Sequence, residues 1–211
     1  MMMMINLPEL PSLPLDTPQL LAIAAALGWA SGLRLYAVLF LTGLAGSVGW
    51  VTLPAGLQVL QSPIMMGASG LMLFIEFFAD KIPGVDTLWD LTHTLVRIPA
   101  GAALAAGVLS SQGVDGQAWS VIAALLGGTL AATAHAAKAG TRAAANTSPE
   151  PFSNIALSLA GDALVPALLW LAWSHPVAFT VLLILWIVLA LTLIRLTFRL
   201  LSGLFKKFRT A

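Results

Sequence analysis

The sequence predicts an all-α protein that crosses a membrane several times. Of its 211 residues, 59% are hydrophobic and only 9% are charged, and the mean hydropathy is +0.93. Soluble domains carry roughly 25% charged residues, so ten basic and nine acidic side chains are too few to cover a water-soluble body of this length. Long apolar runs separated by short polar stretches are typical of a polytopic helical bundle. A water-soluble fold is therefore excluded.

Seven apolar runs provide six to seven expected membrane segments. The last three runs approach the roughly 20 residues that a membrane helix needs, whereas the first four have roughly 16, enough for only about 24 Å of a hydrocarbon core about 30 Å thick. Residues 18–51 therefore either span the membrane twice or form a re-entrant hairpin, since both return the chain to the same face. The seven runs are residues 20–33, 35–51, 64–79, 95–110, 119–137, 152–173 and 176–194.

The distribution of basic residues predicts the orientation. Lysine and arginine collect on the cytoplasmic side of membrane proteins, and seven spans place all ten basic residues of the chain on one face. We expect an extracytoplasmic N-terminal arm at residues 1–17, a transmembrane domain at residues 18–200 and a basic cytoplasmic tail at residues 201–211. The N-terminus would lie outside and the C-terminus inside.

Composition and missing motifs exclude several classes of function. A net charge of +1 provides no electrostatic footprint for nucleic acid. Without cysteine there are no disulfides, zinc thiolate sites or thiol nucleophiles, and no serine-hydrolase elbow, phosphate loop or metalloprotease motif occurs. The expected partners are the lipid bilayer and a small ion or solute, with homo-oligomers an open alternative. No cofactor is indicated beyond a monovalent or divalent cation, and an enzyme is the less expected class.

Two carboxylates end the third apolar run. Glu76 and Asp80 are four residues apart and share one helical face, where a carboxylate in contact with lipid would be costly. They must therefore face protein or water, and Lys81 follows them as a gate or counter-charge. A Pro-Gly pair at positions 83 and 84 predicts the end of this helix.

The next helix carries a polar stripe. Asp86, Asp90 and His93 have i, i+4 and i+7 spacing, and Asp86 can also cap the helix. Such a stripe could bind a divalent cation or relay protons. The alternative is an amphipathic helix at the inner interface, with Trp89 as its aromatic anchor and solvated acids.

A second polar line runs into the sixth apolar run. Its members are four residues apart and so lie on one helical face; they are Glu150, Asn154, Ser158 and Asp162. Asp162 lies roughly 16 Å into the span, and an ionisable residue at that depth is a functional candidate by default. The alternative is that Glu150 caps the helix while Asn154 and Ser158 form hydrogen bonds across a helix interface.

Basic residues near the inner helix ends are the expected counter-charges. They are Arg34, His135, Lys138 and Arg142, and they could pair with Glu76, Asp80 or Glu150. An arginine opposite a carboxylate serves either as a gate or as a structural lock, and the sequence leaves both open.

Two pairs of similar stretches suggest an internal duplication. Transporter folds are often built from repeats, although glycine and arginine also recur at helix ends for local reasons. The pairs are Ser31-Gly32-Leu33-Arg34 with Ala139-Gly140-Thr141-Arg142, and Phe78-Ala79-Asp80 with Ala160-Gly161-Asp162.

Three strings of residues resemble a known family. They are residues 30–36 (ASGLRLY), 76–86 (EFFADKIPGVD) and 146–154 (NTSPEPFSN). Together they are similar to the bacterial integral membrane proteins grouped as domain of unknown function 4126. The resemblance covers roughly residues 20–173. It implies a bacterial integral membrane protein and no established activity. We expect the location to be the inner (plasma) membrane.

These observations favour a transporter or channel for a small ion or polar solute, with Asp162 and Asp80 as the principal carriers on a carboxylate-lined path. One alternative is an interfacial metal-dependent enzyme that acts on lipid phosphate through Asp86, Asp90 and His93. The other is a non-catalytic assembly protein in which the charges only lock helices together. Acids that meet around a hydrated cavity would favour transport, whereas acids already neutralised in a dry bundle would favour the assembly protein.

Overall fold

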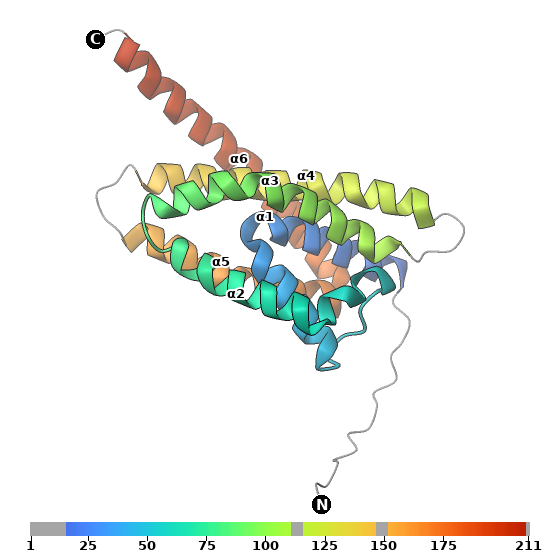
Figure 1. Ribbon diagram of the computed structural model, residues 1–211. Helices are drawn as coiled ribbons and strands as arrows, with labels where there is room; N and C mark the ends of the chain where they lie inside the picture. Colours follow the sequence, from blue (N-terminus) through green and yellow to red (C-terminus); the bar gives the residue numbers. More distant parts are fainter. Residues whose placement is uncertain (1–15, 111–115, 147–151, 210–211) are drawn as a thin grey trace, which may run out of the picture.

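The computed structural model describes residues 16–110, 116–146 and 152–209, with side chains described up to residue 199. Every regular element in this part of the chain is helical, which confirms the predicted all-α bundle (Figure 1). The elements in chain order are α1 Thr17–Ser47, η1 Ala55–Gln61, α2 Pro63–Ala79, α3 Val85–Leu109, α4 Gly116–Ala145, α5 Phe152–Ser174 and α6 Pro176–Arg209.

The first two apolar runs form one helix, α1, which is broken at Arg34. Asp16 caps it, because its carboxylate accepts a hydrogen bond from the Gln19 amide at 2.9 Å. Two full crossings would need about 40 residues, whereas α1 has 31. The structure therefore favours the hairpin alternative, and both ends of α1 lie toward the same end of the bundle (Figure 1).

Contacts of small residues place the two halves of α1. In the first half, a Cβ added to Gly28 would lie 2.7 Å from the Gly127 Cα of α4. In the second half, a Cβ on Gly43 would overlap the Leu60 carbonyl of η1, and η1 in turn meets the last turns of α3 through Gly56 and Gly107. Close backbone approach through small residues is the usual packing of membrane helices.

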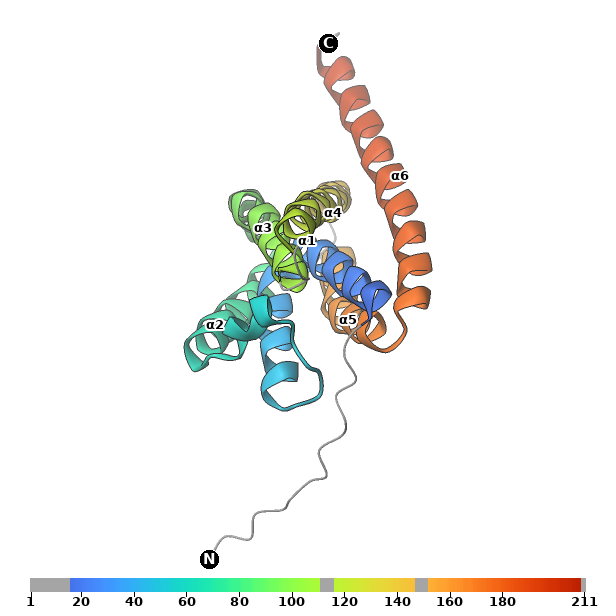
Figure 2. The ribbon, with the colours of Figure 1, turned by 90° about the vertical axis from the view of Figure 1, so that its right-hand side faces the viewer.

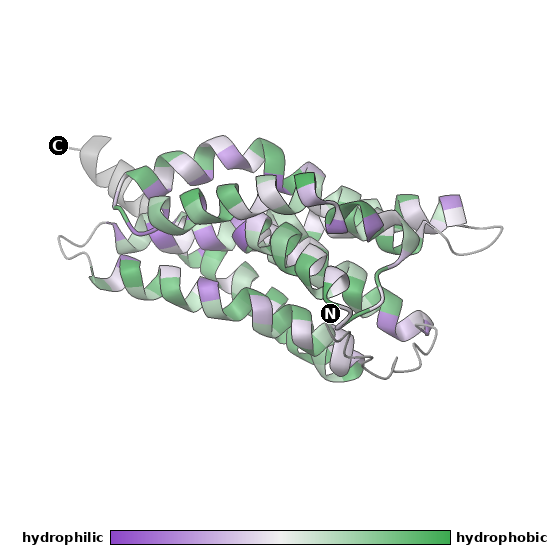
Figure 3. Ribbon diagram, turned by 60° about the horizontal axis from the view of Figure 1, so that its bottom comes forward, coloured by the Kyte–Doolittle hydropathy of each residue, from purple (hydrophilic) through white to green (hydrophobic). Residues whose placement is uncertain are grey.

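Five helices are long and apolar enough to cross a membrane, or six if η1 and α2, which are bent by 70°, form one broken span. Helix α1 is one of the five, and it lies at the centre in Figure 2 between α3, α4 and α5. Hydrophobic residues cover most of the helices in Figure 3. Many of these side chains are exposed, as expected for a surface in contact with lipid. The chain is thus a polytopic helical membrane protein.

The predicted helix boundaries around the polar stretches agree with the structure. Helix α2 ends at Ala79, and α3 begins after Gly84, whose φ of 87° a side chain would disfavour. Asp86 lies in the first turn of α3 and accepts hydrogen bonds from the Gly84 and Thr87 amides at 2.8 and 2.7 Å. Most of the predicted arm lies outside the described residues, and α6 continues through residue 200 without a break.

Candidate functional site: a buried ion-pair network

The candidate site begins at the break in α1. Arg34 has φ −149° and ψ 84°, so the helix is interrupted there. Lys138 Nζ, on α4, donates a hydrogen bond to the Leu33 carbonyl oxygen at 3.0 Å. Discontinuous membrane helices expose backbone groups inside a bundle in this way. The Arg34 side chain enters the interior and is only 1% exposed.

Arg34 joins the end of α2 to the middle of α5. Its Nη1 lies 3.0 Å from Asp80 Oδ2, and its Nη2 lies 2.9 Å from Asp162 Oδ1. Nη2 also donates to Ser158 Oγ at 2.9 Å. Lys81 Nζ approaches the other oxygen of Asp162 at 2.9 Å. Asp162 and Lys81 are each about one-fifth exposed, whereas Asp80 is fully buried.

Arg97 forms the second centre of charge. Its Nη2 lies 2.6 Å from Glu76 Oε1, its Nη1 lies 2.7 Å from Asp90 Oδ1, and neither Arg97 nor Glu76 has any exposed side-chain surface. His135 Nδ1 is 3.1 Å from Arg97 Nη1, and His135 Nε2 forms a 2.7 Å hydrogen bond with the Thr94 hydroxyl. A buried arginine between two carboxylates is stable only because both pairs are made.

Lys138 and Arg142 of α4 connect the two centres. Lys138 Nζ is 3.1 Å from both Asp80 and Asp90, while Arg142 Nη1 is 3.0 Å from Asp80 and 3.9 Å from Asp90. The result is one network of five acids and five bases, and it is balanced in formal charge. The acids are Glu76, Asp80, Asp86, Asp90 and Asp162, and the bases are Arg34, Lys81, Arg97, Lys138 and Arg142.

Most of the predicted path and counter-charge residues meet in this network. Glu76, Asp80 and Asp162 are paired with bases instead of converging around open space. Ser158 bonds to Arg34 and, at 3.3 Å, to Lys81.

Two predicted residues in the described part of the chain stand apart from the ion pairs. His135 contacts Arg97 rather than one of the expected acids. Asn154 is only 1% exposed, and its amide nitrogen and oxygen have no hydrogen-bond partner. Glu150 lies outside the described residues.

Arg97 is the residue that the sequence analysis missed. The sequence indicated Arg97 only as one of the ten basic residues that predict the orientation. Its signal was its place inside the apolar run at residues 95–110, seven residues after Asp90, which is two helical turns and therefore the same face.

The predicted metal stripe does not form a ligand set. Asp86 binds backbone amides and the Asn146 side chain, and Asp90 is paired with Arg97 and Lys138. The His93 ring stacks on Trp89, with ring centroids 4.0 Å apart. Within the described residues, no group of three His, Asp or Glu side chains is placed to hold a metal ion.

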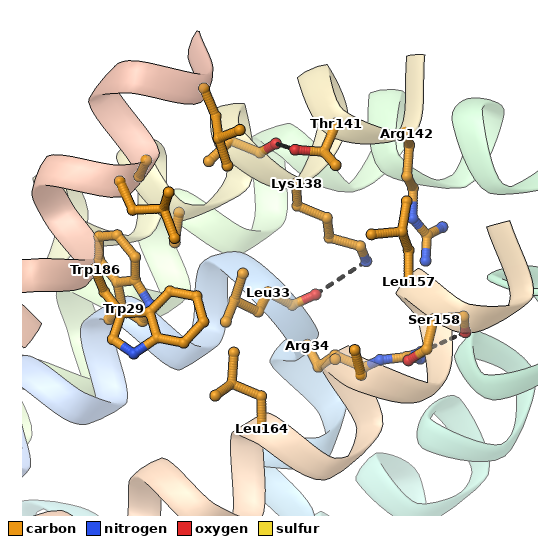
Figure 4. A pocket seen from close by; sticks show the side chains of 17 residues that line it. Trp29, Leu33, Arg34, Lys138, Thr141, Arg142, Leu157, Ser158, Leu164 and Trp186 are labelled. Carbon is orange, nitrogen blue, oxygen red and sulfur yellow. Dashed lines mark hydrogen bonds between the residues drawn. The ribbon is translucent and has the colours of Figure 1, made fainter. Parts of the chain in front are cut away.

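A cavity of about 250 Å³ adjoins the network between α1, α4, α5 and α6. Arg34, Lys138 and Arg142 border it from the network side, and Ser158 and Gly161 of α5 complete that end. Figure 4 shows Trp29 and Trp186 lying together on the other side of the cavity. The network is therefore buried, but it is not sealed on all sides.

Fold and site together define a polytopic membrane protein with a charge-balanced ion-pair network at a helix break. The chain belongs to the family described as Domain of unknown function (DUF4126), whose model matches residues 21–196. No curated protein and no solved structure matches the chain.

Proposed function

We propose that the protein is a membrane transporter for a small ion or polar solute, and that the ion-pair network is its gate. The observation that carries the proposal is the break of α1 at Arg34, whose guanidinium group contacts Asp80 on one side and Asp162 on the other. Transporter sites are typically built at discontinuous helices inside the bundle. Ionisable residues within a membrane are costly and are usually kept for function.

The neutralised acids argue for a gated site rather than an open channel. Asp80 touches three cations, and Asp162 touches two. A passing ion or polar group would have to replace one of these partners. The Asp162–Lys81 pair is the place for that exchange, because it is partly exposed while the Arg97–Glu76 pair is fully buried. The network would then be a closed state of the gate.

The proposed location is a bacterial inner membrane, with the N-terminus outside and the C-terminus in the cytoplasm. The positive-inside rule supports this orientation, since the network end of the bundle and the basic C-terminal part of α6 lie on the same side in Figure 1. An internal duplication belongs to the same proposal. It is supported by Arg34 and Arg142, which occupy equivalent places in the two similar sequences and both contact Asp80.

The Asp162→Asn variant tests the transport proposal. We expect flux to fall to the level of protein-free vesicles, because asparagine keeps the shape of the side chain but removes the charge that Arg34 and Lys81 share. Flux is measured in proteoliposomes, with pyranine for protons and radiolabelled sodium and rubidium for monovalent cations. The matched control is Asp16→Asn, the same change at an exposed helix cap that asparagine also fills well.

A second candidate function, a non-catalytic assembly protein, is favoured by the charge balance itself. Every acid of the network already has a basic partner, as a purely structural lock requires. In that case Asp162→Asn lowers thermal stability, and neither wild type nor variant moves any of the three ions. Flux in the wild type that survives in Asp162→Asn removes Asp162 from the mechanism.

A further inference from the structure

The cavity beside the network has two chemically different ends. One end is cationic and is formed by Arg34, Lys138 and Arg142, while the other is apolar and is formed largely by tryptophan and leucine side chains (Figure 4). None of the described residues that line it is acidic. The acids that balance the network pair with these cations, and none of them lines the cavity. The wall therefore presents positive charge to the space.

Arg34 has a donor left over at this wall. Its two terminal nitrogens face Asp80 and Asp162, but its Nε has no hydrogen-bond partner although the side chain is only 1% exposed. A buried donor without an acceptor destabilises the folded state. Gly161 of α5 lies near this donor, since an added Cβ there would be 3.7 Å from Nε. With glycine at this position, no side chain of residue 161 stands against the donor.

The cavity reaches the lipid-facing surface. Leu157 of α5 and Leu189 of α6 both line the cavity, and they are 36% and 46% exposed. A molecule inside could therefore extend between α5 and α6 into the bilayer. The volume of about 250 Å³ lies just below the roughly 300–1,000 Å³ of drug-sized pockets, which suits a compact headgroup and one chain.

We propose that this cavity binds an amphipathic anion, with a carboxylate or phosphate headgroup at Arg34 Nε and one apolar chain between Trp29 and Trp186. This ligand goes beyond the proposed transport of a small ion or polar solute, and its binding is measured independently of flux. An anionic oxygen would satisfy the free Arg34 donor by a charge-assisted hydrogen bond. The ligand's apolar chain would be buried among apolar side chains. No acidic side chain among the described lining residues would repel its headgroup.

Native mass spectrometry of the full chain in detergent tests the proposal with three probes. Decyl phosphate carries both headgroup and chain, decanol only the chain, and inorganic phosphate only the headgroup. We expect one decyl phosphate per chain and no retained decanol or phosphate. Phosphatidic acid, added in a fourth arm, competes for the site if the natural ligand is a bilayer phospholipid, and leaves decyl phosphate bound if it is a free single-chain anion.

Two substitutions in α6 supply the matched comparison. Leu189 lines the cavity and Leu191 does not, and both are 46% exposed. Leu189→Trp fills the mouth and should weaken decyl phosphate binding at least about tenfold, or about 1.4 kcal/mol, while Leu191→Trp should leave it unchanged. Gly161→Ala places a methyl group 3.7 Å from Arg34 Nε and should also weaken binding.

Equal binding of decyl phosphate and decanol, equal affinity in the two tryptophan variants, or unchanged affinity in Gly161→Ala overturns the proposal. These outcomes are separate from a failure of the transport function. Binding is measured in detergent, without a membrane gradient. If flux depends on Asp162 but decyl phosphate does not bind, only the proposed ligand is refuted. Anion binding without flux of the probe ions or of decyl phosphate refutes only transport.

Discussion

Replacing Arg97 with methionine is expected to lower the free energy of unfolding by about 3–5 kcal/mol. Arg97 is fully buried and holds Glu76 at 2.6 Å and Asp90 at 2.7 Å. Asp90 would keep Lys138 as a partner at 3.1 Å. Glu76 would keep no basic partner within the described residues, and its second oxygen already lacks a hydrogen bond. The measurement is unfolding in mixed micelles by titration with a denaturing detergent, followed by circular dichroism.

A control and a rescue make this result specific. Lys81→Met also removes one ion pair, but that pair is about one-fifth exposed and Asp162 keeps Arg34, so a loss of about 1 kcal/mol or less is expected. Combining Arg97→Met with Glu76→Gln removes the stranded charge and should recover most of the lost stability. If Arg97→Met costs no more than Lys81→Met, the buried pair does not hold the bundle together.

The second large effect is expected for Gly32→Ala, which should destabilise the bundle by about 1–3 kcal/mol or more. An added Cβ would overlap the Ala131 carbonyl oxygen of α4 and lie 2.9 Å from the Ala134 Cβ. Neither atom is the end of a flexible side chain, so the two helices have to separate. Because Gly32 is two residues before the break, the separation also displaces Arg34 from Asp80 and Asp162. Thermal unfolding in detergent and ion flux should therefore both decline.

Gly67→Ala is the matched control for this prediction. Gly67 lies in α2, and an added Cβ meets nothing within 4 Å. Replacing glycine by alanine in an unstrained helix is neutral or stabilises by about 0.4–1 kcal/mol. Comparable losses in the two variants would mean that the close contact of α1 and α4 is not what limits stability.

Several features of the network could be predicted from particular residues. Glu76, Asp80 and Asp162 are acids inside or directly after apolar runs. The free-energy cost of a charge in contact with lipid therefore indicated that each needs a protein or water partner. Asp86, Asp90 and His93 do lie on one helix, as their spacing predicted. Their chemistry depended on the partners that packing supplies, such as Lys138 of α4 for Asp90. Arg97 binds Glu76 of the preceding helix, and Lys138 and Arg142 of α4 bind acids one and two helices away. No spacing along the chain encodes those distances.

The two alternatives for residues 18–51 show the same limit. The length of this segment indicated that it is short for two complete crossings. The distribution of basic residues could not decide, because two crossings and a re-entrant hairpin both return the chain to the same face. In the structure the two halves form one broken helix of 31 residues, which is too short for two crossings. The contacts of Gly28 with α4 and of Gly43 with η1 show where each half packs.

By itself the sequence determined the membrane environment, the helical class and the position of most helix ends, since these follow from hydropathy, helix length and turn residues read along one chain. Only the tertiary structure decided that α1 turns back at Arg34, that the acids are neutralised by bases, and that three cations face an apolar cavity. The physical reason is that an ion pair depends on the distance between side chains from different helices. Helix packing sets that distance, through close contacts that the linear pattern does not contain.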